Sequence, residues 1–198
     1  MVSLETFNSV KEKYGRQASW AIWGPFGAKP KDHMDDLSIF DDPSLHSTLP
    51  QLTADYVLVG LNISTRDITI PLSNFHGKNG EVYKVRYALH KTDLWGAYMT
   101  DILKDFRDSK ADSVSRFLKT PDGLRFEKHN VESFRAELET VGAESATLVA
   151  FGSVVYDILT RHFGDRQRIL KIDHYGYRIN KEIYKHRVHN SLSQASST

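Results

Sequence analysis

Tyr56-Val57-Leu58-Val59-Gly60 is a short, continuously apolar run that contains β-branched residues. Such a run predicts a strand that is buried on both faces, as in a parallel sheet. Three other runs have a similar character, at residues 98–103, 146–151 and 168–172. We therefore expect four strands.

Helical patterns occur between these runs. Helices are expected over residues 4–14, 82–89 and 131–141, from 153 onward, and over 181–190. Asn130 is interpreted as the N-cap of the third helix, and Gly142 as its end. Alternating strands and helices predict one α/β domain over residues 1–198. We expect three layers: a central four-stranded, mainly parallel sheet flanked by helices.

Three segments are expected to be wholly or partly irregular. Residues 1–50 are expected to be an N-terminal helix followed by an irregular segment that covers the domain. Residues 107–129 are charged and contain the turn signal Pro121-Asp122-Gly123, so we expect an exposed excursion. Residues 191–198 are rich in serine and are expected to form a flexible tail.

Composition excludes several classes of protein. The chain has no cysteine, which excludes disulfides, cysteine-bound zinc, iron–sulfur clusters and a cysteine nucleophile. No signal peptide is visible and the apolar runs are strand-sized, so we expect a cytoplasmic protein without a membrane span. Net charge is only +1, but residues 161–198 carry eight Lys and Arg against three Asp and Glu. This basic segment is either a phosphate-binding face or an ordinary solvated helix face.

Polar or small residues follow the expected strands. Asn62 follows the first strand, Asp101 lies at or near the end of the second, Gly152-Ser153 follows the third, and His174 follows the fourth. Ligands of open α/β sheets bind beyond the carboxyl ends of the strands. We therefore expect these side chains to line one cleft, although polar residues at strand ends are also common without function.

Other chemistries find little support. Standard phosphate-binding loops and the Gly-x-Ser-x-Gly elbow are absent. His186 and His189 are three residues apart on the last expected helix, where a solvated face explains them better than a metal site. We expect no metal and no cofactor.

Four segments in order resemble the uracil-DNA glycosylase superfamily, over residues 56–188. Val57-Leu58-Val59-Gly60-Leu61-Asn62 is similar to the first motif, an apolar strand followed by Gly-x-Asn or Gly-x-Asp. Gly96-Ala97-Tyr98-Met99-Thr100-Asp101 lies where the family has a strand with a base-reading residue. Val149-Ala150-Phe151-Gly152-Ser153 resembles the third strand, and Asp173-His174-Tyr175-Gly176 lies where the second motif, typically His-Pro-Ser, is expected.

The resemblance implies a sheet of four parallel strands and a base flipped out of DNA into a pocket. It implies that Asn62 orients the attacking water and that His174 donates a hydrogen bond to the departing base. The substrate-binding residues it implies are Gly60, Leu61, Ser64, Phe75, Asp101, Gly152, Ser153 and Tyr175. Contacts to the DNA backbone would come from Tyr177, Arg178 and Lys181.

Several positions depart from the family pattern. Several branches have Asn where this chain has Asp101, and an ionised Asp offers only acceptors. Asp101 would therefore prefer a base edge rich in donors, or need a raised pKa. Ile63-Ser64 replaces the usual Pro-Gly, and Tyr175-Gly176 replaces Pro-Ser.

The resemblance leads us to expect a DNA glycosylase-like hydrolase that removes a damaged or deaminated base, uracil-type or related, without a metal. The departures motivate a second hypothesis, a non-catalytic module that binds nucleic acid or a nucleotide-like ligand. A third is a small-molecule hydrolase that acts on free nucleosides.

Overall fold

A computed structural model describes residues 1–63, 68–104, 106 and 111–196. Its sheet contains β1 (Ala18–Trp20), β2 (Thr53–Asn62), β3 (Ala97–Leu103), β4 (Thr147–Phe151) and β5 (Ile169–Ile172), in the order β1-β3-β2-β4-β5. The four expected strands are present and parallel, which confirms the α/β class. The expected strand count was wrong, because β1 adds a fifth, antiparallel strand beside β3.

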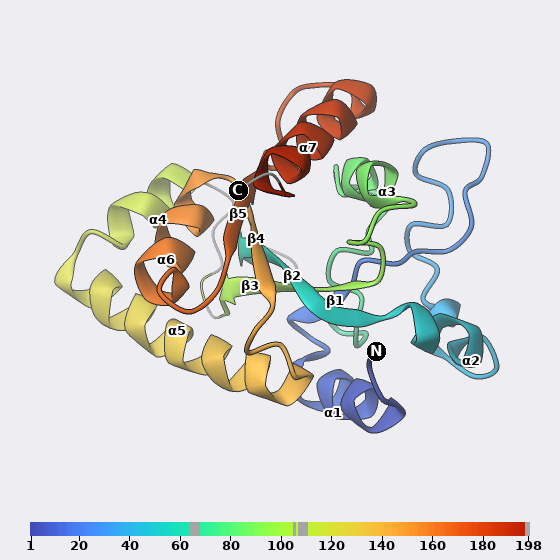
Figure 1. The fold of residues 1–198 in the computed structure, drawn as a ribbon, viewed down its shortest axis with the longest axis horizontal. Coiled ribbons are helices and arrows are strands. Elements are labelled where there is room, and N and C mark those ends of the chain that lie inside the picture. The colour runs from blue at the N-terminus through green and yellow to red at the C-terminus, as the bar shows by residue number, and fades with distance from the viewer. Residues whose placement is uncertain (64–67, 105, 107–110, 197–198) are drawn as a thin grey trace.

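Helices cover both faces of this sheet (Figure 1). One layer contains α1 (Leu4–Tyr14), α4 (Ala111–Phe117), α5 (Pro121–Val141) and α6 (Ser153–Phe163). The other contains α3 (Tyr83–Leu89) and α7 (Lys181–Ser196), which pack against each other. The protein is thus a three-layer α/β domain.

Side chains of β2 alternate between the two layers. Val57 and Val59 belong to the apolar core beneath α1, α5 and α6, whereas Leu58 belongs to the core beneath α3 and α7. All three are fully buried. A strand covered on both faces needs apolar residues at successive positions, which explains the continuous run.

The segment expected as an exposed excursion over 107–129 is mostly helical where the structure describes it, although many of its side chains are exposed as expected. α5 begins at Pro121, and the Thr120 side chain accepts a hydrogen bond from the Gly123 amide at 3.0 Å. Proline fits the first helical position because its missing N–H needs no partner there. Gly142 ends the helix in the left-handed conformation, as expected.

Asn130 does not cap a helix, which corrects another expectation. It lies inside α5, and its side-chain oxygen accepts a 2.7 Å hydrogen bond from the amide of Lys104 at the end of β3. Its amide nitrogen donates to the Phe126 carbonyl at 3.0 Å. Asn130 therefore attaches α5 to β3.

The N-terminal fifty residues contain more regular structure than expected. Besides α1 and β1 they hold the 3-10 helix η1 (Ser38–Phe40), α2 (Leu45–Thr48) and most of a second 3-10 helix, η2 (Leu49–Gln51). The irregular part is held by buried Arg86 of α3, which donates to the carbonyls of Asp32 at 2.6 Å and Gly24 at 2.8 Å. At the other terminus, α7 continues to Ser196 through most of the expected tail.

Among the described residues, no helix has the length and apolar character that crossing a membrane requires.

The strand order creates a crevice at the carboxyl edge of the sheet. The chain passes from β2 to β3 on one side and then crosses to β4 on the other side of β2. A reversal of this kind separates the connections that leave neighbouring strands, and ligands of open α/β sheets bind there.

Candidate functional site

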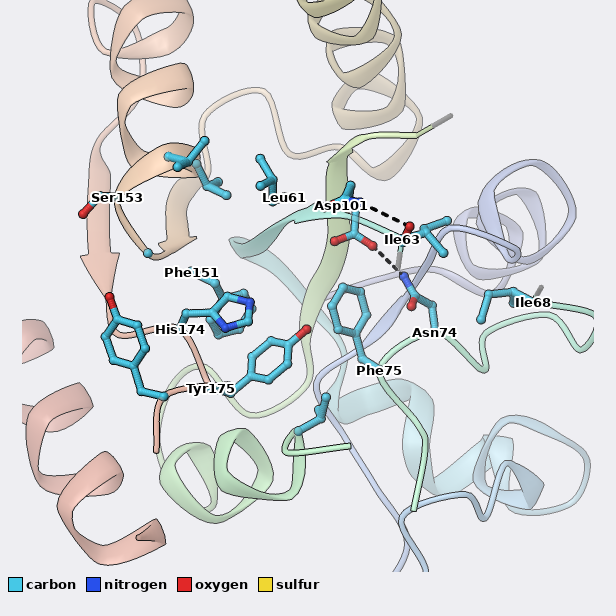
Figure 2. A pocket seen from close by; sticks show the side chains of 16 residues that line it. Leu61, Ile63, Ile68, Asn74, Phe75, Asp101, Phe151, Ser153, His174 and Tyr175 are labelled. Carbon is cyan, nitrogen blue, oxygen red and sulfur yellow. Dashed lines mark hydrogen bonds between the residues drawn. The ribbon is translucent and has the colours of Figure 1, made fainter. Parts of the chain in front are cut away.

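One cavity of about 460 Å³ lies at this edge of the sheet (Figure 2). Its walls come from the ends of β2 and β4, from β3, from the loop after β5 and from the segment before α3. The lining residues are Leu61, Asn62, Ile63, Ile68, Asn74, Phe75, Val82, Asp101, Phe151, Gly152, Ser153, Val154, Val155, His174, Tyr175 and Tyr177. Asn62, Asp101 and His174 therefore face the same cavity, as the sequence led us to expect.

Asn62 is the last residue of β2 and is half-buried. Its amide nitrogen donates to the Phe106 carbonyl at 2.8 Å and makes a longer contact, 3.4 Å, with the Ile63 carbonyl. These bonds hold the side-chain amide at the carboxyl end of β2, beside β3. The contact to Phe106 is one that sequence alone did not suggest.

Asp101 lies within β3, directly opposite Gly60 of β2. The residue is 3 % exposed, and burial raises its pKa to about 6. A methyl group at Gly60 would lie 2.2 Å from the Asp101 Oδ1 atom. The absence of a side chain at Gly60 thus creates the space that Asp101 occupies, which gives that glycine a packing role.

Asn74 is Asp101's hydrogen-bonding partner, and sequence analysis missed it. The Asn74 amide nitrogen donates to Asp101 Oδ2 at 3.0 Å (Figure 2). It also donates to the Gln17 carbonyl at 2.7 Å. Asn74 is buried and lies in a loop, where no periodic pattern marks a buried side chain.

The opposite face of β3 is fixed by a buried polar network. Glu137 of α5 accepts hydrogen bonds from the hydroxyls of Tyr98 and Thr100, each at 2.7 Å, and pairs with Lys104 at 2.6 Å. Lys104 lowers the pKa of Asp101 and Glu137 raises it, but burial has the larger effect on that pKa.

Gly60→Ala is expected to lower the free energy of unfolding by about 1–3 kcal/mol, the usual cost of overpacking a well-packed interior. The new methyl group would displace Asp101 Oδ1 and strain its bond to Asn74. Urea denaturation measures this. Gly80→Ala is the matched control, because a methyl group there meets nothing closer than 3.9 Å. Equal stability of the two variants would contradict the packing role of Gly60.

Phe75 lines the cavity and is buried, with a backbone φ of 65°. Few residues other than glycine adopt this left-handed conformation, which costs free energy. Its carbonyl accepts a 3.2 Å bond from the Trp23 indole, which helps to hold it. Neighbouring His76 does not line the cavity: it is buried and its ring packs against Trp23 and Phe40, and burial lowers its pKa to about 4.

Gly152 and Ser153 form the junction between β4 and α6. Gly152 has a φ of 87°, and its amide donates to the Ile172 carbonyl of β5 at 2.9 Å. A side chain at Gly152 would also point toward His174, whose Cβ lies 3.5 Å from the position of an added methyl group. Gly152 and Ser153 both line the cavity, together with the first turn of α6.

His174 follows β5, and its ring nitrogen Nδ1 accepts a hydrogen bond from the Gly176 amide at 3.0 Å. A backbone amide can only donate, so Nδ1 carries no proton and the neutral ring carries its proton on Nε2. Burial lowers the pKa of His174, which favours this neutral form. Within the described part of the chain Nε2 has no hydrogen-bond partner, so His174 supplies a donor.

Tyr175 stacks on His174, with ring centroids 4.4 Å apart, and its ring meets Phe151 edge-on at 5.3 Å. The loop that contains His174 and Tyr175 is held by Lys84 of α3, a buried residue. Its ammonium group donates to the carbonyls of Tyr175 at 3.3 Å and Tyr177 at 2.8 Å, and pairs with Glu81 at 2.8 Å. Lys84 was not identified from sequence, because lysines on short helices usually face solvent.

Lys84→Met is expected to speed amide hydrogen exchange at Gly176 and Tyr177 roughly tenfold or more, since an unpaired buried polar group costs about 1–3 kcal/mol. Both amides donate to His174, so they report directly on its loop. Lys78→Met is the control: Lys78 is exposed and pairs with Asp35 at 3.0 Å, away from the His174 loop. Unchanged exchange in Lys84→Met would rule out the anchoring role.

The proposed DNA-backbone residues lie differently. Tyr177 lines the cavity and is 49 % exposed. Arg178 is exposed and lies outside the cavity. Lys181 also lies outside it, pairs with Glu182 at 2.6 Å and lies over the ring of Tyr87 at 3.8 Å.

Ser64, a candidate substrate-binding residue, lies outside the described residues. Leu61 lines the cavity, whereas Gly60 contributes by making room for Asp101. Across the residues described, no three His, Asp or Glu side chains cluster as metal ligands would.

Comparisons with known proteins do not assign this site. Neither a scan against models of protein families nor a search of curated proteins finds a match.

Proposed function

We propose that this protein is a DNA glycosylase-like hydrolase that removes a damaged or deaminated base by hydrolysing its N-glycosidic bond. The observation that carries the proposal is that Asn62, Asp101 and His174 line one cavity. They come from three different strands or strand ends, at the edge of the sheet where open α/β folds bind ligands.

Asn62 would orient the attacking water. Its amide nitrogen is held by the Phe106 carbonyl at 2.8 Å, which fixes the plane of the side chain. A carboxamide oxygen has two lone pairs and can accept a hydrogen bond from a water in addition to another contact. An amide is a poor base, so the contribution of Asn62 is positioning, which brings the nucleophile to the reacting carbon at high effective concentration.

His174 would stabilise the departing base. Negative charge develops on the base as the glycosidic bond breaks, and the Nε2 proton of a neutral imidazole can donate to an oxygen or nitrogen that carries this charge. Much of the cavity wall is apolar, including Ile63, Phe75 and Phe151. A hydrogen bond to developing charge is stronger in such surroundings than in water.

A base inside a duplex cannot enter this cavity, so the substrate would be a flipped or single-stranded nucleotide. Exposed Tyr177 and Arg178 adjoin the His174 loop and would contact the sugar-phosphate backbone. Lys181 is expected to contribute less, because its charge is already paired with Glu182.

The test is to incubate the pure protein with oligonucleotides that contain uracil, hypoxanthine, xanthine or an oxidised guanine, and then to treat them with hot alkali. Strand scission at the modified position in at least one duplex or single strand is expected, with release of the free base. Absence of scission across the panel, under conditions in which a control glycosylase cuts, would contradict the proposal. Cleavage of free nucleosides alone would indicate a small-molecule hydrolase instead.

The second candidate is a non-catalytic binding module, and the bond between Asn62 and Phe106 favours it, because that contact explains Asn62 without chemistry. Asn62→Ala separates the two. A glycosylase is expected to lose most of its turnover while it still binds lesion-containing DNA. A binding module shows no turnover in either form.

A further inference from the structure

The polar wall formed by Asn74 and Asp101 offers acceptors to a ligand. Asn74 has two amide hydrogens, and both are used inside the protein, one by the Gln17 carbonyl and one by Asp101 Oδ2. Its carbonyl oxygen is the remaining polar atom of the side chain. Among the residues that the structure describes, no donor bonds to Asp101 Oδ1.

Asp101 is accessible to a ligand even though it is buried from bulk solvent. The residue is 3 % exposed, yet it lines the cavity together with Asn74. A carboxylate removed from water in this way needs hydrogen-bond donors, and Asn74 supplies one to Oδ2 only. The second oxygen therefore requires a donor from whatever occupies the cavity.

We propose that the Asn74–Asp101 pair selects a base whose edge presents two adjacent N–H donors, as the N1–H and 2-amino groups of guanine do. The inference rests on the proposed function and names its substrate class. A guanine damaged in its imidazole ring, by oxidation or alkylation, keeps this edge and would be the base released.

Other bases match this wall poorly. Uracil presents one N–H between two carbonyl oxygens, and hypoxanthine presents N–H and oxygen without an amino group. Adenine and cytosine each place a ring nitrogen that accepts beside their amino group. If a hydrogen-bond acceptor of the base faced Asp101 Oδ1, neither that acceptor nor Oδ1 would have a hydrogen-bond partner. A site that is built to accept a hydrogen bond from its ligand strongly rejects a ligand without the donor.

The Phe75 ring gives the selected base a stacking partner. Phe75 lines the cavity, and its Cε1 atom lies 3.6 Å from the position of an added methyl group at Gly60, the same position that lies 2.2 Å from Asp101 Oδ1. A base hydrogen-bonded to Asp101 therefore lies within reach of this ring. Stacking on an aromatic side chain is worth about 1–3 kcal/mol per base.

The experiment is calorimetric titration of the whole chain with three free bases: 9-ethylguanine, 9-ethylhypoxanthine, which lacks the 2-amino group, and uracil. We expect 9-ethylguanine to bind roughly 10- to 100-fold more tightly than either of the others, which corresponds to one hydrogen bond to a charged acceptor. Equal or tighter binding of uracil would overturn the proposal.

Asp101→Asn is the informative variant. The new amide oxygen can take the bond from Asn74, and its NH₂ group then faces the cavity as a donor. Donor and acceptor side by side match uracil, so the preference for 9-ethylguanine over uracil should reverse or fall at least tenfold. Asp157→Asn, an identical change at an exposed position of α6, should keep the wild-type preference. An unchanged preference in Asp101→Asn would also overturn the proposal.

These outcomes separate this inference from the proposed function. Base release from uracil-containing DNA together with tighter binding of uracil would uphold the glycosylase and reject the guanine-type edge. Tight binding of 9-ethylguanine that is lost in Asp101→Asn, without scission of any oligonucleotide, would uphold the edge-reading pair and reject the glycosylase.

Discussion

His174→Ala is expected to slow base release from lesion-containing DNA about 10²- to 10³-fold, the usual effect of removing one donor to a developing anion. The loss should fall on the rate at saturating DNA, because the Nε2 proton acts on charge that appears as the bond breaks. Single-turnover assays, in which the enzyme exceeds the DNA, measure this rate directly.

Two further variants sharpen this test. His174→Gln keeps a side-chain N–H and should recover part of the rate, which a merely structural His174 would not predict. His186→Ala, on the same C-terminal part of the chain but outside the cavity, should match the wild type. A His174→Ala protein that is folded and as active as the wild type would remove His174 from the reaction.

Asp101→Asn is expected to change how stability depends on pH. The pKa of Asp101 is about 6 in the folded protein, raised by burial from 3.8. The folded state therefore binds a proton more tightly than the unfolded state. This stabilisation is complete below pH 3.8 and is lost as pH rises through about 6, a loss of ~3 kcal/mol. Asparagine does not titrate. The unfolding free energy of the variant minus that of the wild type should therefore rise by ~3 kcal/mol from low pH to pH 7.5.

The measurement is urea denaturation of both proteins between pH 4 and 7.5, with Asp157→Asn, the same substitution at an exposed position of α6, as the control. The quantity that matters is the difference in unfolding free energy between Asp101→Asn and wild type, since all other titrating groups cancel in it. A difference that stays flat across this range would show that Asp101 is not a desolvated carboxyl.

His76 has the opposite effect on stability. Burial lowers its pKa from 6.5 to about 4, so the unfolded state binds the proton more tightly. This contribution is present above pH 6.5 and is lost as pH falls through about 4. Asp101 and His76 thus oppose each other over the same range in the wild type. Removing Asp101 leaves His76 unopposed, so the variant should lose stability more steeply on acidification.

The apolar runs predicted the four parallel strands because a strand that is buried on both faces has an easily recognised sequence pattern, a continuous run of apolar residues. Val57, Leu58 and Val59 are apolar at every position, and their burial in both cores explains why. The sequence of β1 contains no such pattern. It has only three residues, Ala18–Trp20, and it is a strand because it pairs with β3, which no local pattern reveals.

Turns and helix N-termini favour the same residue types. This explains why the start of α5 was predicted to be a turn. Pro121-Asp122-Gly123 resembles a turn, yet Thr120 ahead of it caps a helix. Asn130 is a good N-cap by type, but its partner, the Lys104 amide, is remote in sequence and could not be identified from local pattern.

The candidate site was partly predictable for the same reasons. Asn62 and His174 stood out because each follows or ends an apolar run, and Asp101 because it is a charged residue near the end of one. Asn74 and Lys84 lie in a loop and a short helix, and they matter only through contacts with Asp101 and the His174 loop. Such contacts join residues that the sequence separates, so they emerge only from the folded chain.

The central claim is that this cavity receives a nucleobase between its polar walls. One titration tests it: nuclear magnetic resonance of ¹⁵N-labelled protein with added 9-ethylguanine or uracil, following the side-chain amides of Asn62 and Asn74 and the Nε2–H group of His174. We predict that these three signals shift together with one dissociation constant, while the amide of Asn190 on α7 stays unchanged. Stationary signals for all three at saturating base, or shifts confined to other parts of the protein, would contradict the account.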